Sequence, residues 1–247
     1  MTDSPSTPIV AAQDLVRVFG EGDTSVRALD GVSVEFPKGR LTAIMGPSGS
    51  GKSTLMHLLA GLDRPTSGGV QIDGVELSEL DDGELTELRR DKVGFVFQFF
   101  NLLPVLTADE NILLPLSLAG RDPDPELHDQ LIEAVGLGDR LNHRPSELSG
   151  GQQQRVAVAR ALVSKPSVVF ADEPTGNLDS KSSDEVLALL RRAVDDFGQT
   201  VVMVTHDANA ASIADRVVVL VDGKIVRDQE GTASSDQVLD LMKQVSA

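Results

Sequence analysis

The segment GPSGSGKST at residues 46–54 constrains the fold of this chain more than any other part of the sequence. It follows the apolar run LTAIM and leads directly into KSTLMHLLAGL, whose apolar residues recur with helical spacing. A glycine-rich loop between a buried strand and a helix lets backbone N–H groups turn inward and bind phosphate oxygens at the helix N-terminus. The segment therefore predicts an α/β fold in which a buried strand leads into a phosphate-binding loop.

The same segment matches the pattern G-x-x-x-x-G-K-[ST] at every position, which predicts nucleotide binding. Lys52 is expected to reach the β- and γ-phosphates, and the Ser53 hydroxyl is expected to bind Mg²⁺. A chance glycine-rich turn is the alternative, but it does not account for the strand and the helix on either side. The nucleotide-binding residues expected in this loop are Gly46, Pro47, Ser48, Gly49, Ser50, Gly51, Lys52, Ser53 and Thr54.

Three further strand-like runs end in polar residues. VVFAD ends at Asp172 and is followed by Glu173, VGFVFQ ends at Gln98, and TVVMVTH ends at His206. Ligand sites in parallel sheets lie beyond the carboxyl ends of the strands, so these side chains are expected beside Lys52. Alone, the acidic pair would indicate a solvated loop and the histidine a structural residue. Their convergence on one edge of the sheet favours a site.

These residue types suit the hydrolysis of a nucleoside triphosphate. Asp172 is expected to hold Mg²⁺ directly or through water, and Glu173 to orient and deprotonate the attacking water. Gln98 is expected to touch Mg²⁺ or that water through its side-chain carbonyl. The predicted catalytic residues are Lys52, Gln98, Glu173 and His206, and the predicted metal ligands are Ser53, Gln98 and Asp172.

The remaining pattern predicts a mostly parallel sheet with an N-terminal antiparallel β subdomain and an inserted α-helical subdomain. The inserted part is expected to be helical over NLLPVLTADENILLPLSLA, PELHDQLIEAVGL and GGQQQRVAVARALV. The expected divisions are a disordered tail at 1–8 and a single domain at 9–247, made of a β-rich core (9–98 and 166–230), a helical subdomain (99–165) and a C-terminal helix (231–247).

The composition narrows the class of protein further. The 247 residues contain no apolar run of about 18 residues, so the chain is not expected to span a membrane by itself. The N-terminal MTDSPSTP lacks a basic region followed by an apolar one, so we expect the chain to stay in the cytosol. The absence of cysteine excludes disulfides and thiolate metal sites. The net charge of −16 argues against nucleic acid as a partner.

These motifs, together with LSGGQ at 148–152, occur in the order that is typical of ATP-binding-cassette (ABC) proteins. Over residues 9–230 the chain resembles the nucleotide-binding subunit of an ABC transporter. The resemblance implies a P-loop NTPase core that binds ATP and Mg²⁺ and hydrolyses ATP to ADP and phosphate. It also implies that two copies pack head to tail, most simply as a homodimer. Each ATP would then lie between the phosphate loop of one copy and the LSGGQ segment of the other.

The resemblance assigns further residues to the nucleotide site. Ser149 and the amides of Gly150 and Gly151 are implied to grip the γ-phosphate of the partner's ATP. Asp179 is implied to lie near this interface, and Phe19 to stack on adenine where the family usually has tyrosine. The QQR that follows LSGGQ continues the helix and receives no chemical role. The residues added to the nucleotide site are Phe19, Ser149, Gly150, Gly151, Gln152 and Asp179.

The stretches GLDRPTSG, VGFVFQFFNLLPVLTADENILLPL and DEPTGNLDS resemble the lipoprotein-releasing, macrolide-export and cell-division branch of this family. That branch implies a permease partner with a large extracytoplasmic domain, which holds the ATPase on the cytoplasmic side of the membrane. ATP-driven dimerisation would then power export or mechanical work. The open alternatives are an ATP-gated regulator without net transport, an amino-acid import ATPase, and a soluble ABC ATPase acting on DNA or ribosomes. The net charge disfavours the last of these.

Overall fold

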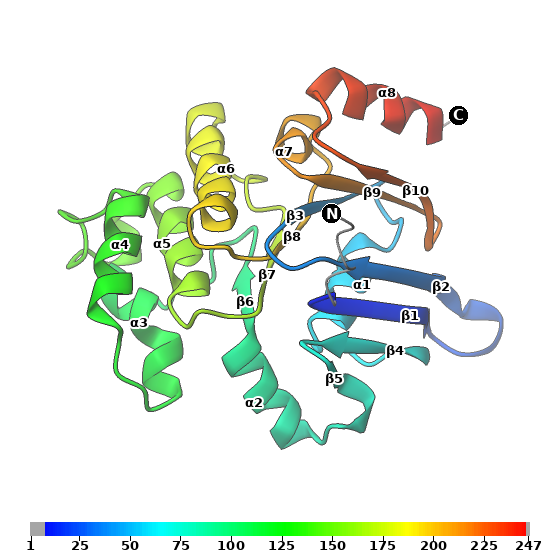
Figure 1. Ribbon diagram of the computed structural model, residues 1–247, viewed down its shortest axis with the longest axis horizontal. Coiled ribbons are helices and arrows are strands. Elements are labelled where there is room, and N and C mark those ends of the chain that lie inside the picture. Colours follow the sequence, from blue (N-terminus) through cyan, green and yellow to red (C-terminus); the bar gives the residue numbers. More distant parts are fainter. Residues whose placement is uncertain (1–7, 246–247) are drawn as a thin grey trace, which may run out of the picture.

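The computed structural model describes residues 8–245, which form two β-sheets and a group of helices (Figure 1). The first sheet is antiparallel with the strand order β2-β1-β4-β5, and the second has the order β10-β9-β3-β8-β7-β6. This combination confirms the predicted fold class. The strands are β1 (Val10–Phe19), β2 (Val26–Phe36), β3 (Leu41–Met45), β4 (Ser67–Ile72), β5 (Val75–Glu76), β6 (Val93–Val96), β7 (Val168–Asp172), β8 (Val201–Val204), β9 (Arg216–Val221) and β10 (Lys224–Glu230).

The six-stranded sheet is parallel from β9 to β6, and β10 is added to its edge as an antiparallel hairpin strand. Successive side chains of a strand point to opposite faces. In β7, Val168 and Phe170 belong to one buried core, whereas Val169 and Ala171 belong to another on the opposite face. Because both faces are covered, the strands are continuous apolar runs rather than alternating ones.

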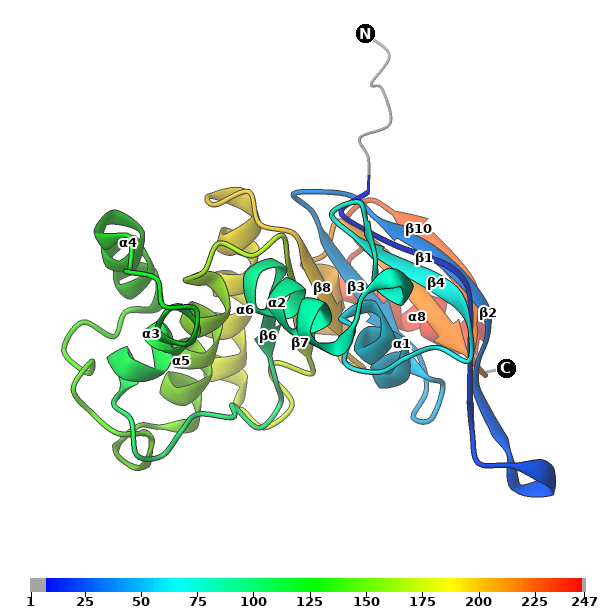
Figure 2. The same ribbon diagram turned by 90° about the horizontal axis from the view of Figure 1, so that it is seen from below.

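Different helices cover the two faces of this sheet. α1 lies between the two sheets, and its Leu55 and Leu58 share a core with Phe170 of β7 and Leu15 of β1. α5 and α6 pack together on the other face, and α3 and α4 extend away from the antiparallel sheet (Figures 1 and 2). The helices are α1 (Lys52–Leu59), α2 (Asp82–Lys92), α3 (Ala108–Leu118), α4 (Pro125–Val135), α5 (Gly150–Leu162), α6 (Ser180–Asp195), α7 (Ala208–Ser212) and α8 (Ser235–Val245).

One predicted helix begins later than the sequence pattern indicates. The pattern predicts a helix over 101–119, but this is wrong for its first part, because α3 begins only after Thr107. The Thr107 hydroxyl accepts a hydrogen bond from the Glu110 N–H at 3.2 Å, and the Glu110 carboxylate accepts one from the Thr107 N–H at 2.8 Å. The buried Asn111 side chain bonds both backbone groups of Leu103. These side-chain bonds satisfy backbone groups that a longer helix would otherwise pair, so the helix begins there.

The part of the chain that the structure describes begins at Pro8 and ends at Val245. The disordered tail predicted at 1–8 lies outside the described residues except for Pro8. At the other end, α8 packs against α7 beside the parallel sheet (Figure 1). Between residues 8 and 245, no helix combines the length and the apolar character needed to cross a bilayer.

Candidate active site

The phosphate loop connects β3 to α1 and contains two positions that require glycine. Gly46 has a φ of 152°, and a Cβ there would lie 2.0 Å from the Leu220 carbonyl oxygen. Gly51 precedes α1 with a φ of 100°, and a Cβ there would lie 2.4 Å from the Ala28 carbonyl oxygen. Both the backbone conformation and the available space therefore exclude a larger residue. The loop consequently presents bare backbone to the space in front of it.

Lys52, the first residue of α1, directs its ammonium group back over this loop. Its Nζ donates hydrogen bonds to the carbonyl oxygens of Gly46 at 2.9 Å and Pro47 at 2.8 Å. Burial lowers the pKa of Lys52, and the negative charges of Glu173 and Asp172 oppose that shift. The loop thus holds a partly desolvated cation, and such a cation attracts a phosphate group more strongly than one in open water.

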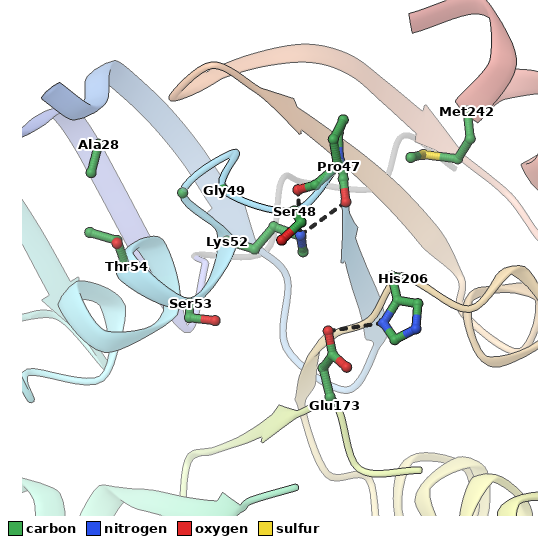
Figure 3. A pocket seen from close by; sticks show the side chains of 12 residues that line it. Ala28, Pro47, Ser48, Gly49, Lys52, Ser53, Thr54, Glu173, His206 and Met242 are labelled. Atoms are coloured by element: carbon green, nitrogen blue, oxygen red, sulfur yellow. Dashed lines mark hydrogen bonds and ion pairs between the residues drawn. The ribbon is translucent and has the colours of Figure 1, made fainter. Parts of the chain in front are cut away.

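The cavity in front of the loop has a volume of about 690 Å³ and brings together residues from distant parts of the sequence (Figure 3). The loop lies on one side of it, and Glu173 and His206 lie on another. Ala28 of β2 and Met242 of α8 also line it, which the sequence pattern did not predict. Ser50 does not line it, and its buried Oγ has no hydrogen-bond partner among the described residues. The predicted residues that line it are Gly46, Pro47, Ser48, Gly49, Gly51, Lys52, Ser53, Thr54, Glu173 and His206.

The ends of β7 and β8 place a carboxylate and an imidazole together. Glu173 Oε1 lies 3.0 Å from His206 Nδ1 (Figure 3). The Glu173 N–H donates to the Val204 carbonyl oxygen of β8 at 2.9 Å, and Glu173 has a φ of 44°. This left-handed conformation is uncommon for a residue with a side chain and is found more often at functional sites. The two parallel strands therefore direct a strained acidic residue toward the cavity.

Asp172 and Ser53 offer oxygen donors of the kind that Mg²⁺ prefers. Mg²⁺ is commonly held by one or two carboxylates together with the phosphates of a substrate, so a cage of several protein carboxylates is not needed. Burial raises the pKa of Asp172, which means that its ionised form is disfavoured where it stands. A divalent cation beside Asp172 would offset this cost, so the donor set fits the metal.

The Gln98 side chain contacts the loop that follows Glu173 and does not line the cavity. Its Nε2 donates to Asn177 Oδ1 at 3.4 Å, and Asn177 Nδ2 donates to the Gln98 carbonyl oxygen at 3.1 Å. A Cβ on Gly176 would lie 2.8 Å from Gln98 Nε2, so the absence of a side chain lets the two loops approach. The contact of Gln98 with Mg²⁺ or water stays a prediction.

The LSGGQ segment forms the N-terminus of α5 and does not line the cavity either. The Ser149 hydroxyl accepts a hydrogen bond from the Gln152 N–H at 3.3 Å, and Gln152 Oε1 accepts one from the Ser149 N–H at 2.8 Å. A Cβ on Gly151 would lie 2.6 Å from Ser182 Oγ, so the starts of α5 and α6 are in close contact. The N-terminus of a helix of this length attracts anions. The chain therefore has two separate features that suit an anion, the loop with Lys52 and the start of α5.

Two other residues predicted for the nucleotide site also lie outside the cavity lining. Asp179 is the N-cap of α6, and hydrogen bonds from the Ser182 N–H at 3.0 Å and the Ser182 hydroxyl at 2.7 Å lower its pKa. Phe19 ends β1 with its ring partly exposed, and the Arg17 guanidinium lies 4.6 Å from the ring centroid. Their contacts with nucleotide stay predictions.

Two polar residues of α5 to which the sequence assigned no role bond backbone groups elsewhere in the fold. Gln154 is fully buried. The Arg160 guanidinium donates to two backbone carbonyl oxygens of the segment after β6, at 2.6 and 2.8 Å, and burial lowers its pKa. The signal for Gln154 was its position, because it precedes the buried Val158 by one helical turn and Ala161 by two. A polar residue on the buried face of a helix needs partners inside the fold.

Comparisons with known proteins identify the family that this chain matches. The family profile described as "ABC transporter" matches residues 29–176. The macrolide export ATP-binding/permease protein MacB of Marinobacter nauticus is 48% identical over 94% of this chain and 36% of its own length. The lipoprotein-releasing system ATP-binding protein LolD of Geobacter metallireducens is 48% identical over 89% of this chain and 99% of its own length. The chain thus spans about a third of the MacB relatives that it matches.

A solved structure gives the same match in three dimensions. The dimeric structure of a post-hydrolysis state of the ATP-binding cassette MJ0796 bound to ADP and Pi superimposes with a TM-score of 0.81 and 43% identity. The match covers 90% of this chain and 98% of that one. The MJ0796 protein comes from Methanocaldococcus jannaschii.

Proposed function

The chain belongs to the ABC transporter family and is one of its ATPase cassettes, and from this premise we propose that it works as a homodimer that drives a membrane permease. One observation carries the proposal: two anion-binding features lie apart on one copy. The cavity with Lys52 and Glu173 is the first, and the capped start of α5 at Ser149 is the second. Head-to-tail pairing brings each feature against its complement on the other copy. The dimeric structure of the MJ0796 cassette with ADP and Pi supports a dimer of such cassettes.

Within each composite site the residues divide the work of hydrolysis. Lys52 and the loop amides bind the β- and γ-phosphates, while Ser53 and Asp172 would hold Mg²⁺. When bound, this ion would supply positive charge beside the phosphate oxygens. Glu173 orients the attacking water and accepts its proton, and His206, 3.0 Å away, keeps the carboxylate directed into the cavity. Ser149 of the other copy closes the site over the γ-phosphate.

The Lys52→Ala variant tests the nucleotide site. ATP affinity should fall by roughly 10- to 100-fold, because a hydrogen bond to a charged group contributes about 1.5–3 kcal/mol. Equilibrium binding of ATP to the monomer at fixed Mg²⁺ measures the effect. Lys92→Ala, which removes an exposed lysine paired with Asp73, should leave the affinity unchanged. Equal ATP affinity of Lys52→Ala and wild type would contradict the proposed role of the loop.

Exposed apolar residues of the helical subdomain (99–165) support a permease partner. Phe99, Val105 and Leu118 are 73%, 71% and 74% exposed. A cleft of about 330 Å³, which Leu118 also lines, opens between β6, α3 and α5. Large apolar side chains with this degree of exposure are typical of a protein interface. We place the permease contact here. From the resemblance of the sequence to the lipoprotein-releasing and macrolide-export branch, we expect that permease to carry a large extracytoplasmic domain. The ATPase then lies on the cytoplasmic side of the membrane.

Co-purification tests the partner. The protein extracted with membranes in mild detergent should retain an integral membrane protein with a large extracytoplasmic domain. The double variant Phe99→Asp/Val105→Asp should lose that protein, because two charges would be buried at the contact, yet should bind ATP normally. Leu239→Asp, on the exposed side of α8, is the matched control and should retain the partner. Recovery of nucleic acid or ribosomes in place of a membrane protein would contradict the proposal.

A further inference from the structure

We infer that Gln154 is a positioning residue that couples the two composite sites of the dimer, an inference that rests on the proposed function. Gln154 lies on α5, shortly after Ser149, and is fully buried. Its Nε2 donates to the Phe97 carbonyl oxygen at 3.1 Å and to the Pro174 carbonyl oxygen at 2.6 Å. Both neighbours are carbonyl oxygens, so only the nitrogen end of the amide can face them. One side chain therefore ties the LSGGQ helix to two loops.

The two acceptor carbonyl groups stand beside two predicted catalytic residues. Phe97 immediately precedes Gln98, and Pro174 immediately follows Glu173. Because a peptide unit is planar and rigid, a shift of the Phe97 carbonyl reorients the backbone of Gln98. A shift of the Pro174 carbonyl likewise moves the segment that begins at Glu173. Gln154 thus sets how far apart the loops that carry Gln98 and Glu173 lie.

The other end of the amide argues against a role in stability alone. Gln154 Oε1 is buried and has no hydrogen-bond partner among residues 8–245. A buried acceptor without a partner destabilises a fold, whereas methionine fills a similar volume without that cost. Stability alone would therefore favour an apolar side chain at this position. What the amide adds is a pair of directed hydrogen bonds to the two loops.

A second residue of the same helix holds the far end of the Gln98 loop. Arg160 Nη2 donates to the Phe100 carbonyl oxygen at 2.8 Å, and Nη1 donates to the Asn101 carbonyl oxygen at 2.6 Å. Phe100 and Asn101 have φ values of 48° and 49°, so this turn adopts a conformation that needs outside support. Between them, Gln154 and Arg160 attach the loop to α5 on both sides of Gln98. The loop therefore moves with the helix.

This arrangement joins one composite site to the other. The start of α5 at Ser149 contacts the ATP held by the partner copy, while Gln98 and Glu173 act on the ATP held by their own copy. An α-helix is a stiff element, so displacement of its N-terminus reaches Gln154 within the next two turns. Engagement of the partner's ATP thus positions Gln98 and Glu173 in the other site. Because ATP bound at one site positions the catalytic residues of the other, hydrolysis at the two sites is cooperative.

The variant Gln154→Met tests the inference, because it keeps the volume and removes both donors. Its kcat should fall by about 10²-fold, the typical effect of a small displacement of catalytic groups. Its ATP affinity as a monomer and its ATP-driven dimerisation should stay within about twofold of wild type, because no nucleotide contact is lost. The Hill coefficient for ATP should be above about 1 and at most about 2 in the wild type, and should fall to about 1 in the variant. Gln153→Met removes a neighbouring, half-buried amide whose one side-chain hydrogen bond within residues 8–245 goes to the Leu148 carbonyl oxygen, and it should change none of these values.

The outcomes separate the inference from the function on which it rests. A wild-type protein that neither dimerises with ATP nor hydrolyses it would contradict the proposed function. A cooperative wild type whose Gln154→Met variant keeps its kcat and Hill coefficient would overturn the coupling. So would a non-cooperative wild type. If Gln154→Met and the shorter amide Gln154→Asn both lose the thermal unfolding transition of wild type, Gln154 is structural and the coupling is again overturned.

Discussion

Glu173→Gln should bind ATP and form the ATP-driven dimer while its hydrolysis falls by roughly 10²- to 10⁴-fold, the usual contribution of a general base. The change keeps the shape of the side chain and removes its ability to accept a proton. The loop, Lys52 and the start of α5 are untouched, so nucleotide binding and dimerisation keep their contacts. His206, 3.0 Å from the carboxylate, loses that carboxylate as a partner and keeps a hydrogen-bond acceptor in the amide. This variant should therefore retain ATP binding and dimerisation while its ATP hydrolysis is strongly reduced.

Phosphate release at saturating ATP and Mg²⁺, together with the dimer fraction at the same ATP concentration, measures both halves of this prediction. Glu87→Gln is the matched control, because Glu87 is exposed on α2 and lies away from the cavity. It should retain wild-type turnover. Normal turnover by Glu173→Gln would show that another group accepts the proton. Loss of ATP binding would show instead that Glu173 supports the nucleotide site itself.

The parts of the site that the sequence predicted lie at the ends of strands. A parallel sheet fixes the edge at which each strand ends, so runs such as VVFAD and TVVMVTH place Glu173 and His206 together without any knowledge of tertiary contacts. The phosphate loop is equally local, because its geometry depends on a strand, its glycines and the helix that follows. Patterns of this kind are short-range, which is why the sequence alone predicts them.

The residues that the sequence missed depend on contacts between segments far apart in the chain. Gln154 reaches Phe97 across 57 positions, and nothing in LSGGQQQR specifies that partner. Met242 lines the cavity because α8 packs against α7, a packing that helical periodicity does not determine. The late start of α3 has a more local cause, because Thr107 and Glu110 form a capping box that a helical pattern of apolar residues conceals. Periodicity indicates that an element exists, and side-chain hydrogen bonds decide where it ends.

Ser149→Arg should leave ATP binding by the monomer intact and abolish the ATP-driven dimer. Ser149 does not line the cavity of its own copy, so its replacement leaves the contacts of Lys52 and the loop unchanged. In the proposed dimer this position would face the partner's γ-phosphate, and a long side chain there would occupy the space that the second surface needs. The cost of such overpacking at a close-fitting contact adds to the loss of the serine hydroxyl. Dimerisation should therefore fail even though arginine is attracted to phosphate.

Size-exclusion chromatography with ATP, in the Glu173→Gln background that prevents hydrolysis, gives the clearest readout. Ser149 also caps α5, and removal of an N-cap costs about 0.5–2 kcal/mol. Thr107→Arg removes an equivalent capping box from α3, so it reports how much of the effect is helix stability alone. It should still dimerise with ATP. A Ser149→Arg protein that dimerises as well as its parent would contradict the shared site, because the start of α5 would then lie away from the partner's nucleotide.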